Sequence, residues 1–168
     1  MYEIRLANES DIPRILEIMK EAYDNLENKS WYYIEGTYDS DWMRNHLSEE
    51  GFTVVSEDSN NIVGFLTVRY PSTDNLGFRI VDDIAGVAHM ETTAVTLKSR
   101  GYNLMCKMID YAESLLDSKY IDLMATVHPN NYASLGSFVK CGYSLVSEDD
   151  NKYGEDLPRC ILLKERHL

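Results

Sequence analysis

A basic turn between a strand and a helix is the first candidate for chemistry in this sequence. The stretch TTAVTLKSRGYNLM, residues 92–105, begins as a strand and continues into a helix, with Lys98, Arg100 and Gly101 between the two. The first backbone N–H groups of a helix lack intrahelical partners and lie at its positive end, so phosphate oxygens could bind there. An ordinary strand-to-helix turn explains the same residues, so this stretch alone does not identify a ligand.

A second stretch lies further along the chain. The segment ATVHPNNYASLGSFVKCGY, residues 125–143, predicts a strand ending at Pro129 and a helix capped by Asn130 or Asn131. Gly142 is suitably placed to end that helix. Each of these features has a local structural explanation.

Together, in this order and near this separation, the two stretches resemble the coenzyme-A-binding motifs of the GNAT superfamily of N-acetyltransferases. The first family motif reads V-x-x-x-x-(Q/R)-x-x-G-x-(G/A), and its positions hold Val95, Arg100, Asn103 and Met105. The second reads N-x-x-(A/S)-x-x-x-Y-x-x-x-G-(F/Y), and its positions hold Asn131, Ser134, Phe138, Gly142 and Tyr143. The resemblance implies acetyl-CoA as the coenzyme, bound by residues at and around these positions: Thr93, Ala94, Val95, Lys98, Arg100, Gly101, Tyr102, Asn103, Leu104, Met105, Asn131, Ser134 and Phe138.

Three positions depart from the family pattern. Asn103 stands where relatives have the central glycine, and Met105 stands where they have a small residue. Asn103 tolerates unusual backbone angles better than most residues. Phe138 replaces a tyrosine that in many relatives protonates the leaving thiolate, and phenylalanine has no proton to donate. Tyr132, Tyr143 or water would have to act instead.

Acetyl transfer to an amine also needs a general base, because an ammonium must lose a proton before it can attack. Strand alternation predicts that His89, Glu91 and Thr93 share one face. The resemblance places Glu91 where relatives often use a carboxylate, and His89 is the second candidate, since an imidazole titrates near neutral pH. Solvated polar residues on an edge strand would explain both equally simply.

Trp31, Tyr32 and Tyr33 lie in a polar, aromatic segment that would border the acceptor pocket in the resembling fold. Aromatic faces among carboxylates suit a cationic amine. Packing of these rings over the sheet is the alternative explanation.

The elements that must position these residues follow from the pattern of apolar residues. It predicts strands over 2–6, 51–57, 61–70, 89–95, 121–127, 143–147 and 160–166, and helices over 11–26, 40–47, 103–116 and 131–141. Residues 71–88 fit either a hairpin extension or a long loop. The order β-α-α-β-β-β-α-β-α-β-β predicts one GNAT-like domain over residues 1–168, an α/β (α+β mixed) fold with a partly parallel sheet of six to seven strands. The last strand could pair between copies, which would give a homodimer.

Composition narrows the classes of function. The 168 residues carry a net charge of −12, which disfavours binding to nucleic acid or to a membrane surface. The N-terminus does not resemble a signal peptide, and the three cysteines do not suggest a disulfide framework, so we expect a cytoplasmic protein. The four histidines show no metal-ligand spacing, so no metal is expected.

The sequence therefore predicts an acetyl-CoA-dependent N-acetyltransferase that acts on a primary amine of a small molecule or peptide. An acyl-CoA sensor with little or no transferase activity is the first alternative, favoured by Asn103, Met105 and Phe138. A domain that binds another phosphorylated ligand at Arg100 and Gly101, or only a protein partner, is the second.

Overall fold

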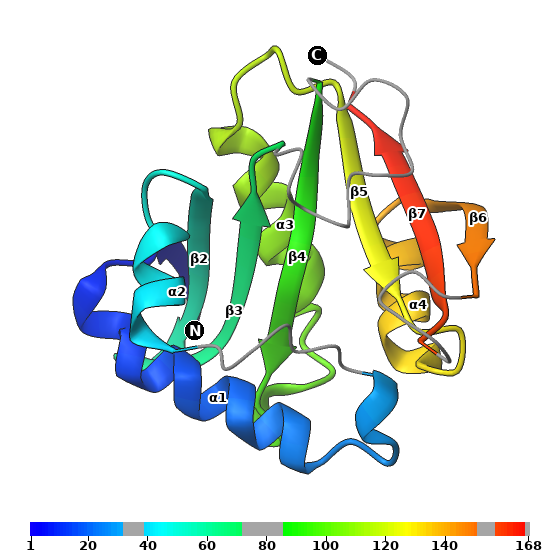
Figure 1. Cartoon of the computed structure of the whole chain (residues 1–168). Helices are drawn as coiled ribbons and strands as arrows, with labels where there is room; N and C mark the ends of the chain where they lie inside the picture. Colours follow the sequence, from blue (N-terminus) through cyan, green and yellow to red (C-terminus); the bar gives the residue numbers. More distant parts are fainter. Residues whose placement is uncertain (32–38, 72–85, 151–156, 167–168) are drawn as a thin grey trace.

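The computed structural model describes residues 1–31, 39–71, 86–150 and 157–166. One sheet of seven strands runs through it in the order β1-β2-β3-β4-β5-β7-β6 (Figure 1). The strands are β1 (Tyr2–Leu6), β2 (Gly51–Asp58), β3 (Asn61–Arg69), β4 (Val87–Val95), β5 (Asp122–Val127), β6 (Ser144–Asp149) and β7 (Arg159–Glu165). Among these strands β4 and β5 form the one parallel pair, so the predicted mixed, partly parallel sheet is confirmed.

Helices cover both faces of this sheet. On one face lie α1 (Ile12–Asp24) and α2 (Ser40–Asn45), whose apolar side chains pack with Val55 and Phe65. On the other face α3 (Leu104–Leu115) and α4 (Tyr132–Lys140) pack against Leu66 and Leu123 (Figure 1). Short 3-10 turns at Glu9–Asp11, Lys29–Trp31 and Leu97–Ser99 join these elements in the described part of the chain. The predicted element order is therefore confirmed.

The hydrophobic periodicity explains α1. Ile12, Ile15 and Met19 follow at spacings of three and four, and all three are buried. Asp11 is the N-cap residue of α1 and makes no side-chain capping hydrogen bond, whereas Asn8 caps the 3-10 turn before it by accepting a hydrogen bond from the Ser10 N–H. Side-chain capping therefore occurs at the start of the 3-10 turn and not at the first residue of α1.

Two expectations about the strands change. β4 begins at Val87, two residues before the predicted start, while the undecided residues 72–85 lie outside the described part of the chain. The last strand, β7, pairs with β5 on one side and β6 on the other, so it is interior and cannot pair between copies as predicted. The strands at the two ends of the sheet order are β1 and β6.

The expectation of no disulfide is also wrong. Cys106 and Cys141 form a disulfide bond with their Cα atoms 5.4 Å apart, whereas Cys160 is a buried free thiol. The bond joins the first turn of α3 to the residue that caps the end of α4. Their separation of 35 residues along the chain hid this proximity, which arises when the two helices pack on the same face of the sheet. The cysteines therefore no longer support a cytoplasmic location.

No helix in the described part of the chain is both long and apolar enough to span a membrane.

Candidate functional site

The central strands separate at one end of the sheet. Parallel pairing between β4 and β5 covers only Val87–His89 against Asp122–Met124, while β4 continues to pair with β3 as far as Val95. Figure 1 shows the two strands diverging toward the end where β4 stops. Beyond the paired segment, the side of β4 that faces β5 has lost its strand neighbour. Backbone groups there are available to a ligand.

A cavity of about 520 Å³ occupies this end of the molecule. Its walls come from four parts of the chain: the last part of β4, the turn into α3 with the first residues of that helix, one side of α4 along its length, and the end of α1 with the segment after it. The lining residues are Ala22, Asn25, Leu26, Glu27, Trp31, Thr93, Ala94, Val95, Ser99, Arg100, Gly101, Asn103, Leu104, Met105, Cys106, Asn131, Ala133, Ser134, Ser137 and Lys140. The volume lies within the range usual for small-molecule and cofactor sites, about 300–1,000 Å³.

The turn into α3 takes its shape from two residues with left-handed backbone. Gly101 has φ of 86°, and Asn103, the N-cap residue of α3, has φ of 60° and ψ of 28°. Asparagine adopts this conformation more readily than other residues that carry a side chain, which explains how it can stand in place of a glycine. The Asn103 side chain makes no capping hydrogen bond, so the first N–H groups of α3 are left for a ligand.

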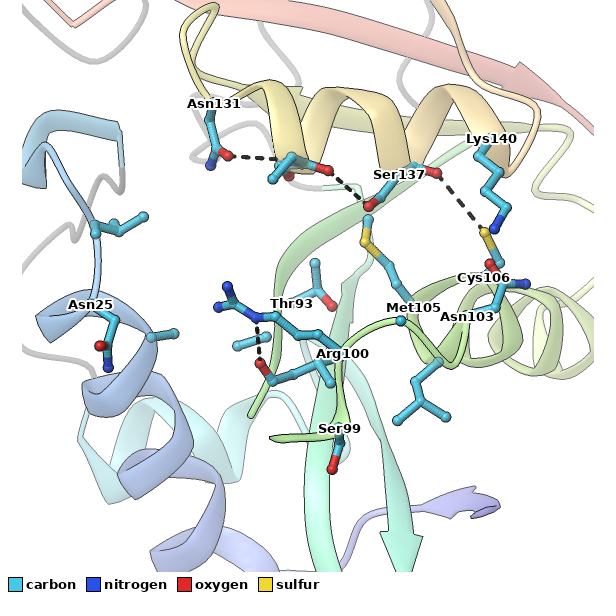
Figure 2. A pocket seen from close by; sticks show the side chains of 18 of the residues that line it. Asn25, Thr93, Ser99, Arg100, Asn103, Met105, Cys106, Asn131, Ser137 and Lys140 are labelled. Atoms are coloured by element: carbon cyan, nitrogen blue, oxygen red, sulfur yellow. Dashed lines mark hydrogen bonds between the residues drawn. The ribbon is translucent and has the colours of Figure 1, made fainter. Parts of the chain in front are cut away.

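Basic side chains stand on two sides of the cavity. Arg100 donates from Nε to the carbonyl oxygen of Val95, 3.3 Å away, and so lies back across the turn (Figure 2). Lys140 lines the opposite wall, near the end of α4 (Figure 2). With the positive end of the α3 dipole these two cations form a local site for an anion on a chain of net charge −12.

The α4 wall is polar. Asn131 caps the helix by accepting a hydrogen bond from the Ser134 N–H at 3.2 Å, and both residues line the cavity. Ser137 follows one turn later and also lines it, with its carbonyl oxygen near the Cys106 sulfur (Figure 2). This wall therefore offers hydroxyl and amide groups to a ligand that extends from the anion site.

The α1 side contributes one buried donor. Trp31 lines the cavity, and its Nε1 is buried with no hydrogen-bond partner in the described structure. A buried N–H without a partner costs free energy, commonly about 1–3 kcal/mol, which a ligand oxygen would recover. Tyr32 and Tyr33, predicted with Trp31 as acceptor contacts, lie outside the described residues.

The structure brings most of the predicted coenzyme-binding residues together. Ten of the thirteen line the cavity: Thr93, Ala94, Val95, Arg100, Gly101, Asn103, Leu104, Met105, Asn131 and Ser134. Lys98, Tyr102 and Phe138 do not. Lys98 and Tyr102 are exposed, while Phe138 is buried in the core with its ring edge against Tyr143 at 5.1 Å.

Sequence reasoning missed the cavity residues of α1 and of the segment after it other than Trp31, three on α4 (Ala133, Ser137 and Lys140), and Ser99 and Cys106. Ser137 and Lys140 follow Ser134 at steps of three, so helical periodicity could have placed them on the same wall. Ala22 and Asn25 carried no such signal, because α1 reaches the site only through packing across the sheet.

A bulge in β4 alters the predicted arrangement of its polar side chains. The β3–β4 register shifts after Thr67 and leaves Glu91 as the extra residue. Alternation therefore reverses beyond it: Thr93 pairs with Leu66 and faces α3, whereas His89 and Glu91 face the side covered by α2. The prediction that Thr93 shares their face is wrong for this reason.

Glu91 lies in a buried group of charges and does not line the cavity. Its Oε1 contacts Nη1 of Arg69 at 3.0 Å and its Oε2 contacts Nε2 of His46 at 3.0 Å. Burial on its own would raise the pKa of this carboxyl, but the contact with His46 and the positive charges of His89, His46 and Arg69 lower it on balance. The carboxylate is therefore anionic at neutral pH. His89 is also buried, and a catalytic role for either residue stays a prediction.

The two tyrosines considered as proton donors lie away from the cavity lining. Tyr132 is 75% exposed at the start of α4. Tyr143 is buried, its hydroxyl has no hydrogen-bond partner in the described structure, and burial raises the pKa of that hydroxyl well above its usual value. In the described residues neither is positioned at the cavity to replace the missing hydroxyl of Phe138.

Comparison with known proteins agrees with this geometry. The acetyltransferase (GNAT) family matches residues 12–143. Among solved structures, the ribosomal-protein-alanine N-acetyltransferase of Brucella melitensis is 21% identical, with a TM-score of 0.72 over 98% of this chain and 99% of that one. Similar matches are yncA of Salmonella typhimurium with its cofactor acetyl-CoA (18% identity, TM-score 0.73, 98% and 93% covered) and Ard1 of Thermoplasma volcanium (15%, 0.74, 99% of each). A search of curated protein sequences gave no match.

Proposed function

The chain belongs to the acetyltransferase (GNAT) family, and from that premise we propose that it is an acetyl-CoA-dependent N-acetyltransferase. It would move an acetyl group to the primary amine of a small molecule or peptide by direct attack in a ternary complex. The observation that carries the proposal is the cavity itself. Arg100, Lys140 and the uncapped N-terminus of α3 form an anion site next to a strand that has separated from its neighbour.

The residues of the cavity fit the coenzyme. A pyrophosphate suits Arg100, Lys140 and the first N–H groups of α3. At Gly101 no described residue other than its two chain neighbours has an atom within 4 Å of where a Cβ would stand, so the backbone is open to close approach. The unpartnered Nε1 of Trp31 offers a donor to an amide carbonyl. Bound acetyl-CoA would supply the acetyl group as a thioester.

The chain's own groups would then perform two tasks. The free side of Thr93–Val95 offers backbone N–H groups that can polarise a carbonyl oxygen, a form of oxyanion stabilisation. A lysine-like amine has a pKa near 10.4, so a base must remove its proton before attack. We assign that task to Glu91, directly or through water, with His89 as the second candidate.

A specific observation favours the sensor alternative. Glu91 is held by Arg69 and His46 and does not line the cavity, and Phe138 has no proton to give a leaving thiolate. A protein that binds acyl-CoA and transfers slowly would show the same geometry. Turnover separates the two readings, because Glu91→Gln should abolish transfer and leave coenzyme binding unchanged if Glu91 is the base.

Heat unfolding with and without acetyl-CoA tests the coenzyme site first. A ligand at 100 times its Kd stabilises the folded state by about 2.7 kcal/mol, which raises Tm by about 5 °C or more in a domain of this size. No shift at millimolar acetyl-CoA or coenzyme A would contradict both the enzyme and the sensor and leave a site for another ligand. A shift would be followed by a mass-spectrometric screen of amines and peptides for an added acetyl group.

Lys140→Gln provides a charge-specific variant, and Lys107→Gln is its matched control on the exposed side of α3. Losing one charged contact to phosphate should weaken coenzyme binding about ten-fold or more, and the loss should shrink at high salt. The control should bind like the wild type. Equal effects of both variants would mean that net charge, and not the cavity, decides affinity.

Trp31 and the aromatic segment after it would contact the acceptor amine, and cell fractionation would test the cytoplasmic location.

A further inference from the structure

A buried histidine lies beside Glu91, at the point where α2 ends. His46 is the C-cap residue of α2, and its side chain is 0% exposed. Its ring stacks on that of Trp42 with centroids 4.0 Å apart, and its Nδ1 lies 2.8 Å from the carbonyl oxygen of Trp42. A carbonyl oxygen can only accept, so Nδ1 must carry a hydrogen. The tautomer of His46 is therefore set by its own helix.

The other ring nitrogen faces a carboxylate. Nε2 of His46 lies 3.0 Å from Oε2 of Glu91, and neither atom has another hydrogen-bond partner in the described structure. With Nδ1 already protonated, a neutral ring would present a lone pair on Nε2 to an anionic oxygen, and the two would repel. A proton on Nε2 turns the same contact into an ion pair.

The charges around this contact also favour an extra proton. Arg69 contacts the second oxygen of Glu91 at 3.0 Å and reaches Glu50 at 3.5 Å, while Glu50 lies 3.8 Å from Nε2 of His46. His89, also buried, is the remaining titratable group whose charge acts on Glu91. Glu50 and Glu91 carry two negative charges against the one positive charge of Arg69, so one proton shared among the imidazoles of His46 and His89 neutralises the group. The 3.0 Å contact between Nε2 of His46 and Oε2 of Glu91 places that proton on His46.

We propose that His46 and Glu91 hold one shared proton, and that His46 is a positioning residue that sets the pH at which Glu91 can accept a proton from the acceptor amine. This inference rests on the proposed function, in which Glu91 is the base. The step is an acid–base exchange alone. The pair first releases its shared proton to water, and the amine's N–H bond then breaks as its proton passes to the pair. Two interacting groups of this kind titrate together, so the midpoint belongs to the pair and not to a lone carboxylate.

The lowered pKa of Glu91 agrees with this arrangement, because the carboxylate stays anionic while the imidazole carries the proton. The family resemblance alone would make Glu91 a base that acts without help from a histidine. Here the basicity of Glu91 instead depends on His46, which lies 45 positions earlier in the chain, before the β2–β3 hairpin.

The first test needs no acceptor substrate. Imidazole ¹⁵N NMR of the full-length protein should show both nitrogens of His46 protonated at pH 7. In Glu91→Gln, which keeps the shape and removes the charge, the His46 midpoint should fall by about one pH unit or more. A neutral His46 at pH 7 in the wild type, or an unchanged midpoint in Glu91→Gln, would overturn the shared proton.

The second test measures rate against pH with an amine found by the screen. In His46→Gln an amide donor replaces Nε2 but cannot release a proton, so the acidic limb of the kcat profile should move to lower pH by about one unit or more. Affinity for acetyl-CoA should stay within about two-fold, because His46 does not line the cavity. An acidic limb at the same pH in both proteins would refute the role of His46.

The two tests also separate this inference from the proposed function. A wild-type protein that acetyl-CoA does not stabilise contradicts the proposed function. A neutral His46 in a protein that does bind acetyl-CoA contradicts the shared proton alone.

Discussion

Breaking the disulfide bond between Cys106 and Cys141 should lower the free energy of unfolding by several kcal/mol. In the chain-entropy view a disulfide stabilises by restricting the unfolded chain, and the effect grows with the closed loop. A separation of 35 residues corresponds to about 3.8 kcal/mol at 25 °C. At about 2–4 °C per kcal/mol for a domain of this size, reduction should lower Tm by about 8–15 °C.

The assay is heat unfolding followed by circular dichroism, with and without dithiothreitol. Thiol counts under denaturing conditions verify the state of the protein: Cys160 alone should react before reduction, and all three cysteines after it. The matched control is the double variant Cys106→Ala, Cys141→Ala. It should unfold at a temperature that dithiothreitol does not change, which separates the bond from any general effect of the reductant.

The same experiment probes the cavity, because Cys106 lines it and the bond joins α3 to α4. Reduced protein should therefore gain less from acetyl-CoA than oxidised protein if the two helices must be held together for binding. A wild-type Tm that falls by less than about 2 °C on verified reduction would refute the reasoning. The disulfide would then hardly reduce the conformational entropy of the unfolded chain.

Three further changes have definite expected results. Asn103→Ala should destabilise the fold by about 1–2 kcal/mol in urea unfolding, because alanine at φ of 60° is strained, whereas Asn103→Gly should not. Phe138→Tyr should lower the free energy of unfolding by about 1–3 kcal/mol and leave turnover unimproved, because the new hydroxyl would be buried in the core beside Tyr143 and not in the cavity. A faster enzyme would contradict that placement. Hydrogen bonds from Arg5 lower the pKa of Asp11 in the folded protein. The pair therefore stabilises the fold fully above the ordinary carboxyl pKa of about 3.9, and this contribution is lost as pH falls through the lowered pKa of Asp11 in the folded state. Arg5→Gln should remove about 1.5–3 kcal/mol at pH 7 and flatten the acid limb of stability against pH, and parallel curves for both proteins would show that the pair does not matter.

Much of the fold could be predicted from the sequence, because helices and strands each have a characteristic spacing of apolar residues. Ile12, Ile15 and Met19 mark one face of α1, and the turn before Asn61 separates two strands that pair as predicted. The anion site was also readable, since Arg100 and Gly101 stand at a strand-to-helix junction whose backbone donors are a local property. Even the substitution of Asn103 for glycine was interpretable from residue type alone, because left-handed backbone is a preference of the residue itself.

Tertiary structure decided what depends on neighbours distant in sequence. The extra residue at Glu91 exists only relative to the strand beside it, and it reversed the face on which Thr93 lies. The disulfide and the contact between His46 and Glu91 each join residues that packing on one side of the sheet brings together, whereas the cavity wall from α1 comes from the opposite face. Local sequence determines backbone preference and periodicity. Whether a base lies beside a group that shares its proton depends on the distance between side chains from different elements, and that distance is defined only in the folded structure.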